Sequence, residues 1–212
     1  MPIMMMNRLH GNIATAGWDG TIRFDPQHPH MIANPIHVLT HERLHMLSPM
    51  RKSGGDAAPS YRGGAVHVEE FCAEHLTAKA HGADQWLRDR HGTVHVRDED
   101  GMYNGTRAYM ATIASEVTAQ HGLGTWKDAV GRLTDGAVSF WRDGSSYSAE
   151  SHVSQFAQHV FKDKPEAARD FAARLTELGK TSSEKLESDY AGYIGQVRAV
   201  KAGGGKVAAL TA

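Results

Sequence analysis

The sequence predicts an α+β protein that is mainly helical, with short strands confined to its first half. Residues 21–24 (TIRF) alternate in polarity as a half-buried strand does, and residues 93–96 (TVHV) form a second strand-like run. From residue 103 onward, apolar residues recur at helical spacing along most of the chain. A few early strands followed by many helices favour α+β over an alternating α/β arrangement.

The first long helix is predicted from Pro35. Asn34 is a candidate cap, and Pro35 suits the first helical position. Ile36, Leu39, Leu44 and Leu47 then follow at helical spacing until Pro49 ends the segment. The preceding stretch QHPHMIANP is predicted to be a loop.

A second helix is predicted from about residue 65 to residue 80, and Gly82 closes it. Residues 83–102 are charged and irregular apart from the strand at 93–96. Further helices are then predicted, over residues 104–121, 124–134, 148–161, 165–179 and 182–201.

Charge and hydropathy exclude several classes of protein. Lys and Arg number 23 and Asp and Glu 24, so a net charge of −1 gives no general attraction to nucleic acid or anionic membrane. No stretch approaches the roughly 20 apolar residues of a membrane span. The N-terminal MPIMMMNRLHGN lacks a signal-peptide pattern, so we expect synthesis in the cytoplasm and export, if any, by a specialised secretion system.

The motif HERLH at residues 41–45 lies inside the first predicted helix. His41 and His45 are four residues apart, which places them on one face of a helix, about 40° apart in azimuth. Two imidazoles in this arrangement can bind one zinc ion. Glu42 follows the first histidine and lies beside the ion, where a carboxylate can accept a proton from zinc-bound water.

The second helix supplies the third ligand that a catalytic zinc site needs. In VHVEEFCAEHL, Glu70 and Glu74 share one helical face, while Val68 and Cys72 lie on the opposite, apolar face. Glu70 is the predicted third ligand, and Glu74 is predicted to hold a histidine ligand through its other ring nitrogen. Glu69 is the alternative ligand. The single Cys72 cannot form an internal disulfide and is predicted to be a packed thiol.

HERLH followed by EEFCAE resembles the glutamate zincins, the thermolysin-like metallopeptidases, whose H-E-x-x-H helix is followed by a helix with a ligand Glu. The 24 residues between His45 and Glu70 are similar to the short spacing of that group. Glu69 and Phe71 stand where the family commonly has Asn and often has Gly, and Glu74 replaces the Asp of thermolysin. The resemblance covers residues 20–80.

This resemblance implies a Zn²⁺-dependent metallopeptidase in which Glu42 assists the attack of zinc-bound water on a peptide carbonyl. The oxyanion then needs a further donor. Tyr103 is the first candidate, because small zincins often carry a Tyr at the start of the helix after the Glu helix, and His95 and Tyr109 are alternatives. Residues 21–24 are similar in position to the family's substrate-binding edge strand.

Most of the other histidines are predicted to serve structure. His28 and His30 are expected in a loop near the entrance to the site, and His67, His75 and His81 at the surface or at helix ends. The aromatic residues Trp126, Phe140 and Trp141 are expected in the core of the C-terminal helices.

The organisation implied by the resemblance is one zincin-like domain over residues 1–202, with a zinc-site core (1–100), a helical subdomain (103–202) and a flexible tail at 203–212. Its size and motif order are similar to bacterial metallopeptidase effector and toxin domains. The expected partners are a protein or peptide substrate, such as a peptidoglycan stem peptide, and an immunity or inhibitor protein. The alternative hypothesis is a non-enzymatic helical interaction protein with structural zinc or none; a single cysteine disfavours a structural site.

Overall fold

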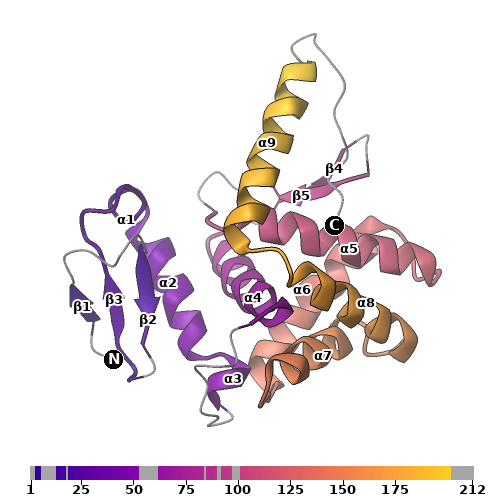
Figure 1. Cartoon of the computed structure of the whole chain (residues 1–212), viewed down its shortest axis with the longest axis horizontal. Coiled ribbons are helices and arrows are strands. Elements are labelled where there is room, and N and C mark those ends of the chain that lie inside the picture. Colours follow the sequence, from indigo (N-terminus) through magenta and orange to yellow (C-terminus); the bar gives the residue numbers. More distant parts are fainter. Residues whose placement is uncertain are drawn as a thin grey trace.

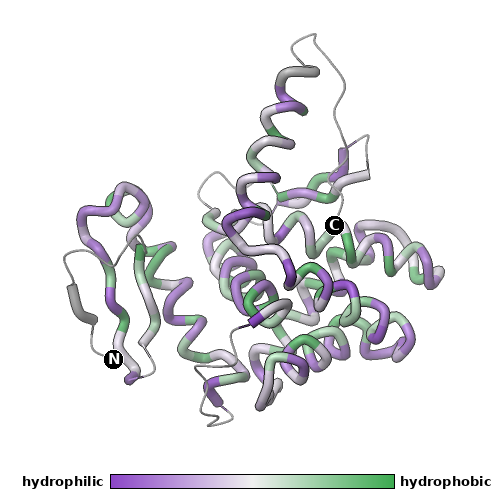
Figure 2. The backbone as a smooth tube through the Cα atoms, in the orientation of Figure 1, coloured by the Kyte–Doolittle hydropathy of each residue, from purple (hydrophilic) through white to green (hydrophobic). Residues whose placement is uncertain are grey.

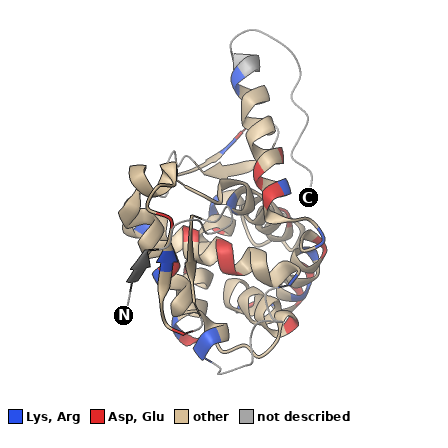
Figure 3. Cartoon of the chain, turned by 60° about the vertical axis from the view of Figure 1, so that its left-hand side comes forward, with Lys and Arg blue, Asp and Glu red and all other residues tan. Residues whose placement is uncertain are grey.

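The computed structural model describes residues 3–5, 13–17, 19–52, 62–83, 85–89, 92–96 and 101–201. It confirms the predicted class, because short strands at the N-terminus precede a mainly helical chain (Figure 1). No helix in the described ranges is long and apolar enough to cross a membrane. Figure 3 shows that basic and acidic residues are interspersed along the helices and strands.

Three short strands form a sheet beside the histidine helix. They are β1 (Ile3–Met5), β2 (Ala14–Ala16) and β3 (Ile22–Phe24), and they lie in the order β1-β3-β2. β1 is parallel to β3, and β2 is antiparallel to it. The expectation that residues 21–24 form an edge strand is therefore wrong, because β3 is hydrogen-bonded on both sides. In the described sheet, β2 is the edge that lies against the histidine helix.

The segment QHPHMIANP is helical, where the sequence predicted a loop. It contains α1 (Pro29–Ala33), whose first turn is capped by His28: the ring Nδ1 accepts a hydrogen bond from the His30 N–H at 3.2 Å. Ser, Thr, Asp and Asn are the usual residues at such a cap, so a histidine cap leaves little signal in the sequence.

The histidine helix α2 (Pro35–Met46) begins at Pro35 as predicted, but Asn34 makes no side-chain cap hydrogen bond to it. Asn34 also ends α1, where its backbone N–H donates to the His30 carbonyl oxygen at 2.9 Å. One residue therefore serves two adjoining helix ends. Pro49 opens a further short helix, α3 (Pro49–Lys52).

The second predicted helix is α4 (Gly64–Ala80), and Gly82 beyond its end has a left-handed φ of 71°. A ribbon follows, in which β4 (Trp86–Arg88) pairs antiparallel with β5 (Val94–Val96). The sequence predicted the second of these strands and missed the first, because three residues are too few to show a period of two.

Five helices predicted from the sequence complete the described chain: α5 (Asn104–Gln120), α6 (Trp126–Asp143), α7 (Ala149–Val160), α8 (Pro165–Leu178) and α9 (Ser183–Lys201). The predicted end of α6 at residue 134 is too early, because the helix continues through Gly136. Gly136 lies at a close approach of α6 to α7. A Cβ atom at Gly136 would lie 2.6 Å from Val160 Cγ2.

Helices α4 to α9 share one hydrophobic core, and a smaller cluster joins β2, α1 and α2. Figure 2 shows the hydropathy of the residues along these elements. The core includes Phe140 and Trp141, as predicted, with Trp126 partly buried at its edge. The smaller cluster contains Ala14, Met31 and Val38. In Figure 1, α2 lies on the side of the sheet and α4 on the side of the other helices. The single-domain boundaries stay a prediction, and the tail at 203–212 lies outside the described residues.

The close approach of α6 and α7 generates a stability prediction. Gly136→Ala should lower the free energy of unfolding by about 1–3 kcal/mol, because the added methyl group overlaps Val160. Gly131 lies on the same helix, where an added Cβ would meet nothing within 4 Å, so Gly131→Ala should raise stability by about 0.5–1 kcal/mol. Urea unfolding of both variants measures the two effects, and equal changes would contradict the packing explanation.

Candidate metal centre

The site is formed where α2 packs against α4 (Figure 1). His41 and His45 lie one turn apart on α2, and Glu70 lies on the facing side of α4. Both histidines are buried, and the Glu70 side chain is 18% exposed. The structure therefore brings together the three residues that the sequence predicted as metal ligands, and the group could hold a metal ion.

The three donor atoms form a small triangle. His41 Nε2 lies 2.9 Å from His45 Nε2 and 3.2 Å from Glu70 Oε2, and the His45 Nε2 to Glu70 Oε2 distance is 3.3 Å. Bonds of about 2.0–2.2 Å to a tetrahedral ion place its ligand atoms about 3.3–3.6 Å apart. The observed spacings are close to these values, so the donor set fits a divalent cation after small side-chain adjustments.

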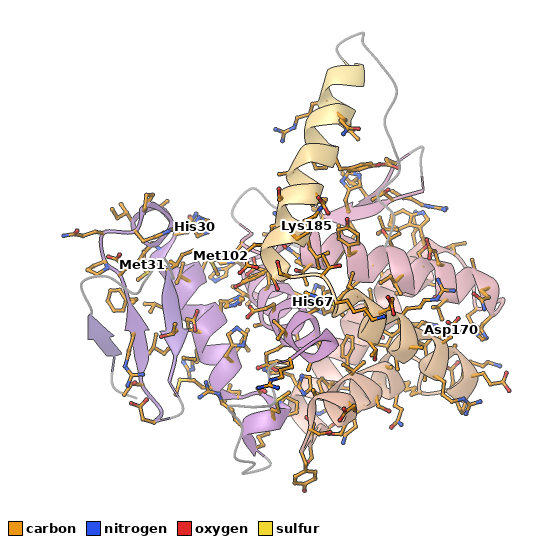
Figure 4. All side chains as sticks on the ribbon, viewed as in Figure 1. His30, Met31, His67, Met102, Asp170 and Lys185 are labelled. Carbon is orange, nitrogen blue, oxygen red and sulfur yellow. The ribbon has the colours of Figure 1, made fainter. Side chains whose placement is uncertain are left out.

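Glu74 orients the first histidine. Its Oε2 lies 2.9 Å from His41 Nδ1, so the opposite ring nitrogen is directed at the donor triangle. The other carboxylate oxygen lies 2.9 Å from His37 Nε2 and accepts a hydrogen bond from the Met102 N–H at 3.1 Å. Met102 lies where the N-terminal region meets the helices (Figure 4). Glu74 is thus buried and held from three sides.

Glu69 lies outside the donor triangle, although it was the alternative ligand. Its Oε1 lies 3.2 Å from His45 Nδ1, and its Oε2 accepts a hydrogen bond from Ser48 Oγ at 3.0 Å. His152 Nε2, on α7, lies 3.2 Å from the same Oε2. His41 and His45 are therefore each contacted by a buried carboxylate on the ring nitrogen that faces away from the triangle.

Glu42 is buried beside His41 and His45. It accepts a hydrogen bond from the Ala16 backbone N–H on β2. Burial raises the pKa of Glu42, and the positive charges of His45 and His41 offset part of that rise. A carboxylate with a raised pKa is a better proton acceptor than an exposed one.

Tyr103 lies over the site from the start of α5. Its ring stacks on that of His41, with centroids 5.4 Å apart and an angle of 13° between the planes. The negative charge of Glu70, together with burial, raises the pKa of Tyr103 well above its usual range, so the phenol keeps its proton at neutral pH. Of the two alternatives, Tyr109 is packed in the hydrophobic core, and His95 lies on β5 opposite Leu87.

The C-terminal helix α9 fixes the backbone that follows Tyr103. Glu187 accepts hydrogen bonds from the N–H groups of Gly105 and Thr106, at 2.7 and 2.8 Å. A carboxylate in this position satisfies donors in the first turn of α5 and complements the positive end of its dipole. α9 thereby holds the start of the helix that bears Tyr103.

The charges of the centre depend on one another. Burial would lower the pKa of His41, but hydrogen bonds to Glu70 and Glu74 outweigh it and raise the pKa to about 9. The pKa of His45 is raised well above 6.5, because the Glu70 charge and the contact with Glu69 outweigh burial. Burial would raise the pKa of each carboxylate partner, yet the histidines hold Glu69, Glu70 and Glu74 below their usual range.

Several histidines differ from their predicted positions. His67 and His75 are buried rather than at the surface, and His67 Nε2 lies 2.8 Å from the Thr181 carbonyl oxygen (Figure 4). His81 is the C-cap residue of α4, as expected, and its ring stacks on His37 at 5.8 Å. Cys72 is fully buried, in agreement with a packed thiol.

His37 and His152 are the residues that sequence reasoning missed. His37 precedes His41 by one helical turn, so the spacing 37, 41, 45 is a local signal that could have found it. His152 leaves no comparable signal, because only the packing of α7 against α4 brings it to Glu69.

Comparison of the chain with protein-family models, curated proteins and solved structures found no match. The geometry of the site is that of a His41/His45/Glu70 group that could hold a metal ion.

The charges of the centre predict how metal alters stability with pH. In the metal-free protein, the raised pKa of His41 stabilises the fold fully below pH 6.5, and this contribution is lost as pH rises through about 9. Metal replaces the protons on both histidines, so the loaded protein should avoid this loss. The difference in Tm between Zn²⁺-loaded and chelator-treated protein should grow between pH 6.5 and about 9. Parallel pH profiles for the two forms would contradict the assignment.

Proposed function

We propose that this protein is a zinc-dependent metallopeptidase of the glutamate-zincin type. The observation that supports this most directly is the convergence of His41 Nε2, His45 Nε2 and Glu70 Oε2 within 2.9–3.3 Å of one another, with Glu42 buried beside them. Two histidines and one glutamate form the ligand set of several catalytic zinc sites, in which a fourth position stays open.

Zinc suits these ligands because imidazole nitrogen and carboxylate oxygen bind it at matching bond lengths. When bound, the ion acts as a Lewis acid that acidifies a neighbouring water and polarises a carbonyl group. Glu74 and Glu69 each contact a histidine Nδ1, which favours the tautomer whose Nε2 lone pair is directed at the ion.

Glu42 acts as the general base. Its raised pKa favours acceptance of a proton from the attacking water, and the same carboxyl group then donates the proton to the leaving amine. The Ala16 N–H fixes the carboxylate against the edge strand β2. In the described sheet, β3 is paired on both sides and cannot add a peptide strand, and Arg51 occupies the Ala16 and Gly17 carbonyl oxygens at the β2 edge.

Tyr103 acts as the donor to the developing oxyanion. The phenol keeps its proton, and the stacked position on His41 places it next to the ligand group. The substrate class is protein or peptide. Delivery as a secreted effector, with an immunity protein as partner, rests on size and motif order alone.

The role of Glu42 predicts a separation of binding from catalysis. Glu42→Gln keeps the size of the side chain and removes the base, so peptidase activity should fall by at least about 10²-fold while zinc content stays near one per chain. Zinc in the purified protein and cleavage of a peptide library measure the two properties. His45→Ala is the control that should lose both.

Two results would count against the peptidase function. One is a chain that binds zinc tightly yet cleaves no peptide, which would favour an interaction protein with structural zinc. The other is a Glu42→Gln variant that is as active as the unmodified chain.

The role of Tyr103 predicts an effect on turnover. Tyr103→Phe keeps the stacked ring and removes the hydroxyl donor, so kcat should fall about 10²–10³-fold with little change in KM or zinc affinity. Tyr109→Phe is the matched control, because Tyr109 lies in the core and its variant should keep full kcat. Steady-state kinetics on one cleaved peptide distinguish the two, and an unchanged kcat in Tyr103→Phe would remove this residue from the mechanism.

A further inference from the structure

We propose that His152, on α7, is a positioning residue for the metal centre: it holds Glu69 in the orientation in which that carboxylate orients His45. The inference rests on the proposed metal-dependent function and extends it to a residue of the helical region, outside both segments that carry the ligand motif.

Glu69 is a fully buried carboxylate at the junction of three elements. His45 Nδ1 on α2 lies 3.2 Å from Oε1, whereas Ser48 Oγ and His152 Nε2 lie 3.0 and 3.2 Å from Oε2. A buried carboxylate needs donors around it, because burial without them costs several kcal/mol. From α7, His152 brings its ring Nε2 to ion-pair distance of this carboxylate, and Phe140 of α6 packs against the His152 ring.

The contact between Glu69 and His45 selects a tautomer. An ionised carboxylate can only accept hydrogen bonds, so the proton of a neutral His45 must lie on Nδ1. Its Nε2 then presents a lone pair toward His41 and Glu70. This is the form that a metal ion requires. If Glu69 turned away, the preference for this tautomer would weaken.

His152 is itself rigidly placed. It is fully buried, and its Nδ1 lies 2.8 Å from Ser146 Oγ, which is also buried. Its ring meets Phe140 edge to face, with centroids 4.9 Å apart. Since both ring nitrogens and one face have contacts, His152 can hold the carboxylate in one orientation.

The contact between His152 and Glu69 also bears on which of two adjacent carboxylates can bind the metal ion. Glu69 and Glu70 are neighbours on α4, and only Glu70 belongs to the donor triangle. Attraction of Glu69 Oε2 to His152 and Ser48 draws this oxygen away from the triangle. His152 thereby favours Glu70 as the ligand and leaves Glu69 to support His45.

The test is the affinity of the full chain for Zn²⁺, measured by competition with a chromogenic chelator. His152→Ala should weaken binding about 10–100-fold, the usual effect of removing a group that orients a ligand. His152→Gln keeps an N–H donor and should restore most of the affinity. In a Glu69→Gln background, His152→Ala should cause little further loss, because the two residues act through one contact.

His159 provides a matched control. It lies on the same helix, contacts the same Phe140 ring at 5.6 Å and lies 2.9 Å from Ser139 Oγ. His159→Ala should alter the Tm but leave Zn²⁺ affinity unchanged. The absorption spectrum of the Co²⁺-loaded protein should change in His152→Ala and not in this control, which separates positioning from a general loss of stability.

The following results would overturn the positioning role of His152 or the metal-dependent function. Unchanged Zn²⁺ affinity in a folded His152→Ala variant, or equal losses in the two alanine variants, would overturn the role of His152 while leaving the metallopeptidase function intact. An unmodified chain that does not bind Zn²⁺ would overturn both proposals. If His152→Ala does not fold, Ser146→Ala releases the other side of the same ring, and unchanged affinity there would overturn the positioning role.

Discussion

The packing of α2 against α4 is the interaction on which the candidate centre depends, because it places imidazoles of one helix between carboxylates of the other. Neither set of groups is stable alone in a buried site, since an isolated buried charge costs several kcal/mol. Together they form two chains of alternating histidines and carboxylates. One chain runs from His37 through Glu74 to His41, and the other from His152 through Glu69 to His45. The two chains meet where His41 contacts His45. The cost of burial is offset only when all members are in place, so fold and site are coupled.

Helices α5, α7 and α9 contact or position residues of these chains. α7 brings His152 to Glu69, α5 places Tyr103 over His41, and Glu187 of α9 fastens the first turn of α5. Trp141 of α6 donates its indole N–H to the Leu44 carbonyl oxygen at the end of α2, at 3.0 Å. The site is therefore assembled from segments spread over most of the described chain, although its ligand motif is short.

The sequence predicted the parts of this arrangement that depend on local spacing. His41, His45, Glu70 and Glu74 follow from one-turn intervals on two helices, and the fold class follows from periodicity. It failed where tertiary contacts decide: Gly136 stays helical because α7 packs on it, and β3 became central because a strand from residues 3–5 paired beside it. No local pattern could predict that Glu69 contacts His45 and not the metal group, since one of the residues that contacts Glu69, His152, lies on a helix distant in sequence.

The face of α2 toward the sheet carries apolar residues, whereas its face toward α4 is polar. Val38 is buried in the smaller cluster, whereas the face of α2 toward α4 buries His37, His41 and His45. This face of α2 therefore joins the rest of the molecule through polar groups, with Leu44 adding an apolar contact to the main core. Separation of these two parts would expose buried ionisable groups to water, and such exposure makes the heat-capacity change smaller than for an apolar interface of equal area.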